Sequence, residues 1–253
     1  MFSGMIRIAS LLFATTIALG TVASATCSNS SVSGTYGFVA SGTTRKNQPT
    51  ATVGQLTVIP GTPDGTLSGT ETLDVNGIVT TSPITGTYSI AASCAGTATI
   101  NAPGITTAHF RFEVVSGGHR IETVQTDKGA IVFGYAMAQG NATCTNQGIG
   151  TKYGFQNSGP VVGFGPIAFV GRLRFDGSGG VRGDESGSQA GSIVKGVPLS
   201  GSYAVNSDCT GSAVLTPEGT AATNFNFVVV DNGNTLLAIE TDPMTVVTGV
   251  LRH

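Results

Sequence analysis

The sequence predicts an all-β protein made of two tandem antiparallel eight-stranded barrels, each with one disulfide. Three observations predict this class: 37 of the 253 residues are glycine, only 10% are charged, and 40% are hydrophobic. An ordinary soluble domain carries about 25% charged residues, and long helices need Glu, Lys, Leu and Arg in quantity. Intrinsic disorder needs few apolar residues and a high net charge, whereas the formal net charge here is -2.

The first 25 residues predict a signal peptide. Arg7 precedes an apolar run over 8–19, and Val22-Ala23-Ser24-Ala25 is a small-residue cleavage signal. We therefore expect the mature chain to begin at Thr26 and to be exported to the extracellular space or the periplasm. No later run is long and apolar enough for a transmembrane helix. The chain also lacks the basic excess that neutralises phosphates, so we expect no nucleic acid partner.

The mature chain consists of two copies of a unit of about 115 residues, which is the size of one domain. This repeat predicts one domain over 26–140 and another over 141–253, joined by a short polar stretch. The matching segments are Tyr36-Gly37-Phe38 with Tyr153-Gly154-Phe155, Val53-Gly54-Gln55-Leu56 with Val170-Gly171-Arg172-Leu173, Gly86-Thr87-Tyr88 with Gly201-Ser202-Tyr203, and Phe110-x-Phe112 with Phe225-x-Phe227.

The four cysteines follow the same repeat. Homologous units should repeat their own bridge, which predicts the pairs Cys27–Cys94 and Cys144–Cys209. A zinc site needs closely spaced pairs such as C-x-x-C, and the sequence contains none, so we expect no metal. An exported protein meets the oxidising conditions in which disulfides form.

Turn residues divide the first copy into eight strands. Asn76-Gly77 and Gly117-Gly118 have the composition of two-residue hairpin turns. Eight consecutive antiparallel strands favour an up-and-down barrel, because closure removes both edges, and a β-sandwich is the alternative. The predicted strands are 35–42, 50–60, 66–75, 78–90, 96–101, 106–115, 119–126 and 130–138.

With these features the pattern resembles bacterial exported repeat proteins of unassigned role. Eight strands in one unit is also similar to the lipocalin-like barrel shared by allene oxide cyclases and dirigent proteins. The resemblance implies a barrel fold over the whole mature chain. No catalytic motif of either family matches positions here, so it implies no catalytic residue.

A search for chemistry finds no catalytic residue and no cofactor site. There is no G-x-S-x-G elbow. The histidines His109 and His119 have asparagine at the equivalent positions of the second copy, and we expect both to face solvent. We therefore expect the protein not to be an enzyme.

Two repeated glutamates are the candidate ligand contacts. Alternation places Glu71 on the same face as Leu73 and Val75, and Glu185 holds the equivalent position. On a barrel's inner wall such a carboxyl could fix a polar atom of a ligand, although a glutamate at the barrel mouth or paired with an arginine is the structural alternative. Phe112 and Phe227 would supply apolar walls.

The sequence thus favours a non-catalytic binding or structural module that holds a small apolar or amphiphilic ligand. The alternatives are a cyclase-like or isomerase-like enzyme acting on an apolar substrate in the cavity, and an adhesin-like surface module. The classes differ in whether the barrel interior leaves room for a ligand.

Overall fold

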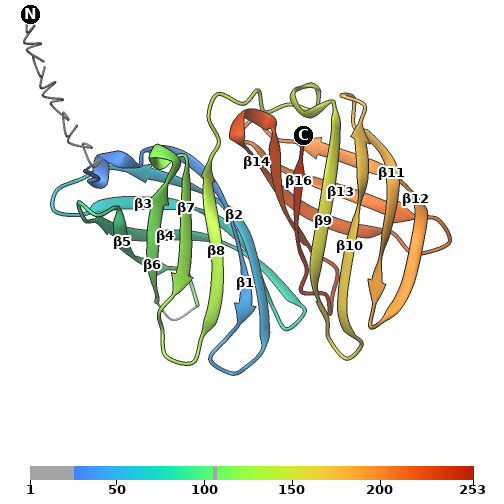
Figure 1. Ribbon diagram of the computed structural model, residues 1–253, viewed down its shortest axis with the longest axis horizontal. Coiled ribbons are helices and arrows are strands. Elements are labelled where there is room, and N and C mark those ends of the chain that lie inside the picture. Colours follow the sequence, from blue (N-terminus) through green and yellow to red (C-terminus); the bar gives the residue numbers. More distant parts are fainter. Residues whose placement is uncertain (1–25, 105–106) are drawn as a thin grey trace, which may run out of the picture.

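The computed structural model describes residues 26–104 and 107–253, and the signal peptide expected over 1–25 lies outside them. The chain forms two closed antiparallel barrels of eight strands each, which lie side by side (Figure 1). The barrel prediction is therefore confirmed over the sandwich. In the part of the chain that the structure describes, no helix has the length and apolar character needed to cross a membrane.

Barrel 1 is an up-and-down meander in which each strand pairs with the next and β1 closes against β8. Each strand predicted for this copy is present, and its ends differ by at most two residues from the prediction. The strands are β1 Gly34–Thr43, β2 Pro49–Ile59, β3 Gly65–Val75, β4 Ile78–Ile90, β5 Ala95–Asn101, β6 Ala108–Val115, β7 Arg120–Gln125 and β8 Ile131–Ala138.

Barrel 2 repeats this order, and β16 closes against β9. Short 3-10 helices precede the first strand of each barrel: η1 is Asn29–Ser31 and η3 is Gln147–Ile149. The strands are β9 Lys152–Val161, β10 Gly165–Phe175, β11 Gly180–Gln189, β12 Ser192–Val205, β13 Thr210–Pro217, β14 Thr223–Val230, β15 Thr235–Glu240 and β16 Thr248–Arg252.

The two predicted hairpin turns have different outcomes. Asn76 and Gly77 both have positive φ angles, of 56° and 81°, which matches a two-residue turn between β3 and β4. Gly117-Gly118 is not such a turn. The connection from β6 to β7 contains the 3-10 helix η2, Ser116–Gly118, and its carbonyl at Gly118 accepts a hydrogen bond from the buried hydroxyl of Tyr36 at 2.7 Å. The connection therefore spans residues 116–119, between the paired Val115 and Arg120, and is wider than a two-residue turn.

Both predicted disulfides are present, Cys27–Cys94 with Cα atoms 4.9 Å apart and Cys144–Cys209 with 4.8 Å. Each links the segment before the first strand of a barrel to the turn between its fourth and fifth strands. The N-terminal segment of each unit is thereby fixed across one end of its barrel.

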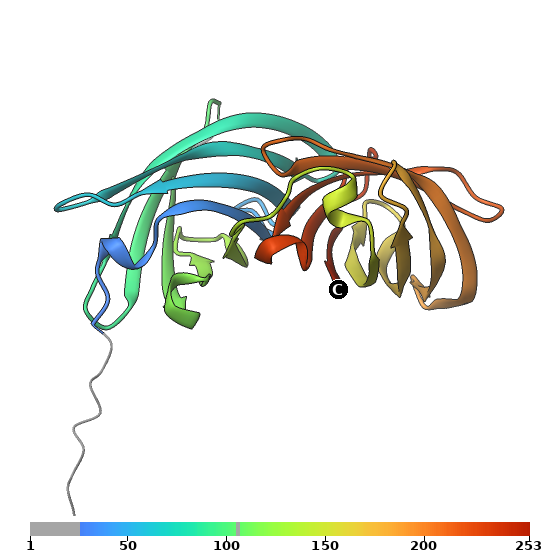
Figure 2. The same ribbon diagram turned by 90° about the horizontal axis from the view of Figure 1, so that it is seen from above.

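Each barrel has its own apolar core, and a further apolar cluster, which the repeat did not predict, joins the two barrels. It lies where β1 and β2 of barrel 1 pack against β14 and β15 of barrel 2 (Figure 2). Polar contacts also cross the boundary, including the amide of Asn226 donating to Thr72 Oγ1 at 3.1 Å. The buried members of this interface cluster are Val39, Ala51, Val53, Met137, Val228, Val230, Leu237, Ile239 and Val246.

Candidate ligand-binding site

Barrel 1 contains a cavity of about 620 Å³. Inward side chains of all eight strands form its wall, because alternate residues of a strand point to the same face. Small-molecule pockets typically measure about 300–1,000 Å³ and are mostly apolar. The large apolar wall residues are Phe38, Leu56, Leu67, Leu73, Ile84, Ile100, Phe110, Phe112 and Ile121.

The segment before β1 lies across one end of barrel 1, at the upper left of Figure 1, and its Val32 lines the cavity. The Tyr88 hydroxyl lies 3.1 Å from the carbonyl oxygen of Asn29, to which it donates. The Asn29 side chain accepts the backbone N–H of Ile90 at 2.8 Å. Together with the Cys27–Cys94 bridge, these bonds hold η1 over the barrel end. A ligand must therefore enter from the opposite end.

The open end carries polar and charged side chains. Lys46 and Gln48, in the turn between β1 and β2, line the entrance, and Lys46 is exposed. Arg45 also lines it and forms an ion pair with Asp127, with 2.8 Å between Nη2 and Oδ1. The entrance to the apolar cavity thus presents a lysine that has no ion-pair partner within residues 26–104 and 107–253.

Asp127 organises this rim. Burial by itself raises the pKa of its carboxyl, but hydrogen bonds from Gln125, from the backbone and ring of His109, and the charge of Arg45 outweigh burial and hold the pKa well below its usual range. The backbone N–H of His109 donates to Oδ2 at 2.9 Å. Asp242 accepts the equivalent bond from Asn224 in barrel 2 at 2.7 Å, so both aspartates cap backbone groups.

Glu71 lies on the inner wall, on the same face as Leu73 and Val75, and all three line the cavity. The Thr52 hydroxyl donates to Glu71 Oε2 at 3.1 Å. Burial raises the pKa of Glu71, and this hydrogen bond opposes the rise. Glu71 therefore points into the cavity, and its hydrogen-bond partner is a threonine rather than an arginine.

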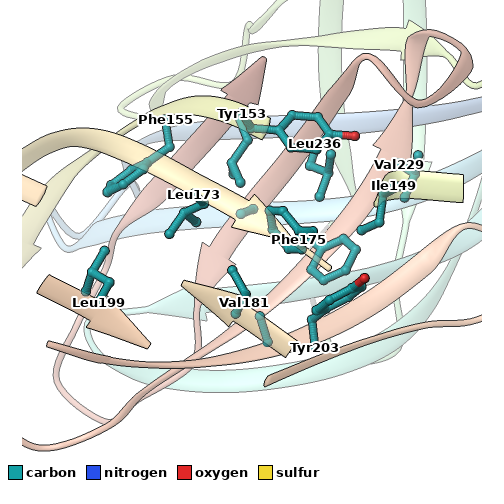
Figure 3. Packing of buried hydrophobic residues seen from close by; sticks show 14 of the residues in the cluster. Ile149, Tyr153, Phe155, Leu173, Phe175, Val181, Leu199, Tyr203, Val229 and Leu236 are labelled. Atoms are coloured by element: carbon teal, nitrogen blue, oxygen red, sulfur yellow. The ribbon is translucent and has the colours of Figure 1, made fainter. Parts of the chain in front are cut away.

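The core of barrel 2 is a packed cluster of buried aromatic and aliphatic side chains (Figure 3). Phe175 lies between two tyrosine rings in edge-to-face contact, with centroids 5.5 Å from Tyr153 and 4.8 Å from Tyr203. Edge-to-face geometry is favourable for aromatic pairs. Phe227, with 4% of its surface exposed, belongs to the same core cluster. Four tyrosines at matching positions of the two copies are all buried: Tyr36, Tyr88, Tyr153 and Tyr203.

Two substitutions between the copies distinguish the two interiors. The recurring segment that aligns Leu56 with Leu173 also aligns Thr52 with Phe169 and Val58 with Phe175. Phe169 packs against the core of barrel 2 and Phe175 is part of that core. Barrel 2 thus has two phenyl rings where barrel 1 has a threonine and a valine, both of which line its cavity.

The carboxyls of barrel 2 lie near its interior. Glu185 lies on the same face of β11 as the core residue Val181, and Glu240 lies on the same face of β15 as Leu236 and Ala238, which places both on the inner face. Burial raises the pKa of Glu185. Burial first, and then the charges of Asp242, Asp74 and Glu185, together raise the pKa of Glu240 to about 7, although a hydrogen bond with Thr245 opposes the rise. Among the described residues no group of His, Cys, Asp and Glu is arranged to hold a metal ion.

The structure thus brings Glu71 and Phe112 together in one cavity, whereas Glu185 and Phe227 lie in barrel 2. Residue reasoning missed Thr52 and the rim residues Arg45 and Lys46. The signal for Thr52 was available, because the aligned copies carry Thr in one and Phe in the other. His109 is exposed as expected, whereas His119 is only half-exposed and its Nε2 lies 3.1 Å from Asp231 Oδ1 of barrel 2.

An open groove of about 740 Å³ lies between the barrels. Its wall combines the charged Arg120 and Glu122 with the exposed apolar side chains Phe133 and Val170. The eight strands of barrel 1 surround its cavity, whereas this groove is open to one side and is formed by the outer faces of the two barrels. The interior therefore offers more contact area to a small ligand.

Comparisons with known proteins give little further information. No family model and no curated protein matches the chain. Among solved structures, the chain is similar to one described as a putative AttH from Nitrosomonas europaea, with 8% sequence identity and a TM-score of 0.29, over 95% of this chain and 98% of that one. A similarity at this level supports no conclusion about fold or function.

Proposed function

We propose that this protein is an exported, non-catalytic binding protein whose first barrel holds a small apolar or amphiphilic ligand. The observation that carries the proposal is the cavity of about 620 Å³ in barrel 1, walled by aliphatic and phenyl side chains. Transfer of a ligand's apolar surface from water into such a cavity contributes about 25 cal/mol per Å². The second barrel, with its packed core, acts as a structural partner.

Export is supported by the N-terminal sequence and by the two disulfides, which persist in oxidising compartments. The measurement is the intact mass of the secreted protein. We expect a mature chain that begins at Thr26 and carries no lipid, whereas a retained N-terminal segment or a lipidated Cys27 would contradict this part of the proposal.

The binding test is titration of the full mature chain with parinaric acid, a fluorescent fatty acid. We expect saturable binding of one probe per chain. The matched variants exchange the residues that differ between the barrels. Thr52→Phe and Val58→Phe give barrel 1 the side chains of barrel 2 and should abolish binding, because the rings occupy the cavity.

The control is Phe133→Val, which removes a phenyl ring from an exposed position on β8 and should leave probe affinity unchanged. Melting curves show whether each variant is folded. Failure of the wild-type protein to bind the probe, or undiminished binding by both cavity-filling variants, would refute the proposal. Mass spectrometry of the recovered probe tests the non-catalytic role: chemical change would favour the isomerase alternative.

A further inference from the structure

We propose that barrel 1 selects amphiphiles that carry a hydroxyl group near the middle of the apolar chain, through a hydrogen bond to Glu71. This inference rests on the proposed function and names the ligand class. Such a ligand would place its anionic head group at the rim, its hydroxyl halfway into the cavity, and its apolar tail at the closed end.

Glu71 lies at a depth in the cavity that matches the middle of a bound ligand. Glu71 pairs with Gly54 of β2 and Ser82 of β4, well inside β3. Val75 ends that strand four residues later, which is roughly 13 Å along the strand at about 3.3 Å per residue. Leu67 lies on the other side of Glu71 along the same face, toward the closed end. The carboxyl therefore stands between two apolar zones.

The hydrogen bonds of Glu71 leave room for one more donor. Thr52 satisfies Oε2, while Oε1 accepts no hydrogen bond and the carboxyl has no ion-pair partner within the described residues 26–104 and 107–253. A carboxyl beside an apolar cavity is costly unless its oxygens are hydrogen-bonded. A ligand that brings a hydroxyl to Oε1 removes this cost, and a plain alkyl chain does not.

The rim decides the charge of the ligand's head. Lys46 is exposed at the entrance, and Arg45 stands beside it in its ion pair with Asp127. Like charges repel and opposite charges attract across this short distance, so an ammonium head is disfavoured and a carboxylate favoured. A cationic partner for Glu71 would have to pass this rim, which leaves a neutral hydroxyl as the fitting donor.

Barrel 2 provides an internal comparison. The position of Thr52 is taken by Phe169 there, so Glu185 lacks the hydroxyl that orients Glu71. Of these two glutamates, Glu71 is the one that has both a threonine partner and an open cavity beside it.

The test compares calorimetric titrations with stearate and with hydroxystearate that carries its hydroxyl near mid-chain. We expect the wild-type chain to bind hydroxystearate about tenfold more tightly, the size expected for one hydrogen bond to a charged group. Glu71→Met should remove the preference and strengthen stearate binding, because the unpaired carboxyl is gone. Glu71→Gln should keep part of the preference, since its carbonyl still accepts.

The outcomes separate this inference from the proposed function. If stearate and hydroxystearate bind the wild-type chain equally, or if Glu71→Met keeps the preference, the selectivity role of Glu71 is wrong while ligand binding stands. If neither binds and parinaric acid also fails, the proposed function itself is wrong. Thr52→Val serves as a second variant, which should weaken the preference because it removes the hydroxyl that orients Glu71.

Discussion

Phe175 is a central aromatic residue in the core of barrel 2. Its side chain is only 3% exposed and lies between Tyr153 and Tyr203. Phe175→Val installs the residue found at the equivalent place in barrel 1. The ring is removed, both aromatic contacts are lost, and a void remains where barrel 1 has its cavity.

The expected loss of stability follows from the core position. Phe→Ala in a core costs about 3–5 kcal/mol. Valine retains two methyl groups beyond alanine, each worth about 0.8 kcal/mol, while each lost edge-to-face pair costs about 0.5–1.5 kcal/mol. We therefore expect Phe175→Val to lower the free energy of unfolding by about 2–6 kcal/mol.

Urea titration of the full chain, followed by near-ultraviolet circular dichroism, measures this difference. The matched control is Phe133→Val, the same chemical change at a side chain that is 64% exposed, which should change stability by less than about 0.5 kcal/mol. The barrels share the interface cluster, so we expect one unfolding transition. A loss below about 1 kcal/mol for Phe175→Val, or equal losses for both variants, would refute the argument that this ring is central to the core of barrel 2.

Three further predictions concern the bridges, a buried carboxyl and the interface. Replacing Cys27 and Cys94 by alanine should cost about 4 kcal/mol on the loop-entropy model, because the bridge spans 67 residues; an unchanged urea midpoint would contradict this. Glu240 has a folded pKa of about 7, above its ordinary 4.5, so its neutral form is favoured in the fold and its stabilising contribution falls as pH rises from 4.5 through 7. Glu240→Gln should remove that slope from stability measured against pH, and an identical slope in both proteins would count against it. Leu237→Ala at the interface should cost about 2–5 kcal/mol in urea titration, since Leu237 is fully buried; a surface-like effect would show that the barrels are not coupled there.

Local sequence patterns were enough to predict the strands, because turn chemistry and alternation act within a few residues. Asn76-Gly77 allows positive φ angles at both turn positions, and in β6 the buried Phe112 and Val114 alternate with exposed residues. Gly117-Gly118 has similar turn chemistry, but the hydroxyl of Tyr36, far away in sequence, bonds to Gly118. A contact of that range leaves no local signal.

The interface between the barrels corresponds to a difference in sequence between the two copies, which could be interpreted only with the structure. Glu113 and Glu122 are exposed on the outer face of barrel 1, and the equivalent residues of barrel 2 are Val228 and Leu237, which are buried. Two acidic side chains in one copy and two aliphatic ones in the other indicate a covered face. Which surface covers it depends on how the second barrel is placed, and periodicity carries no information about that.

The candidate site was predictable in part. Alternation placed Glu71 on the inner face with Leu73 and Val75, and the structure agrees. The repeat also suggested that Glu185 would be equivalent in function. The interiors differ, however, because Phe169 and Phe175 replace Thr52 and Val58, and their effect on volume depends on which side chains share one level of a closed barrel.

The sequence by itself determined the all-β class, the two units, their strands and both disulfides, because repeats, turns and cysteine spacing are properties of the chain in order. The tertiary structure decided the choice of barrel over sandwich, which the sequence had only favoured, and it alone decided the cavity in the first unit, the aromatic core of the second, and the apolar contact between the units. These depend on distances between residues far apart in sequence. Side-chain volume and exposure acquire their meaning only after the strands have closed around a common interior.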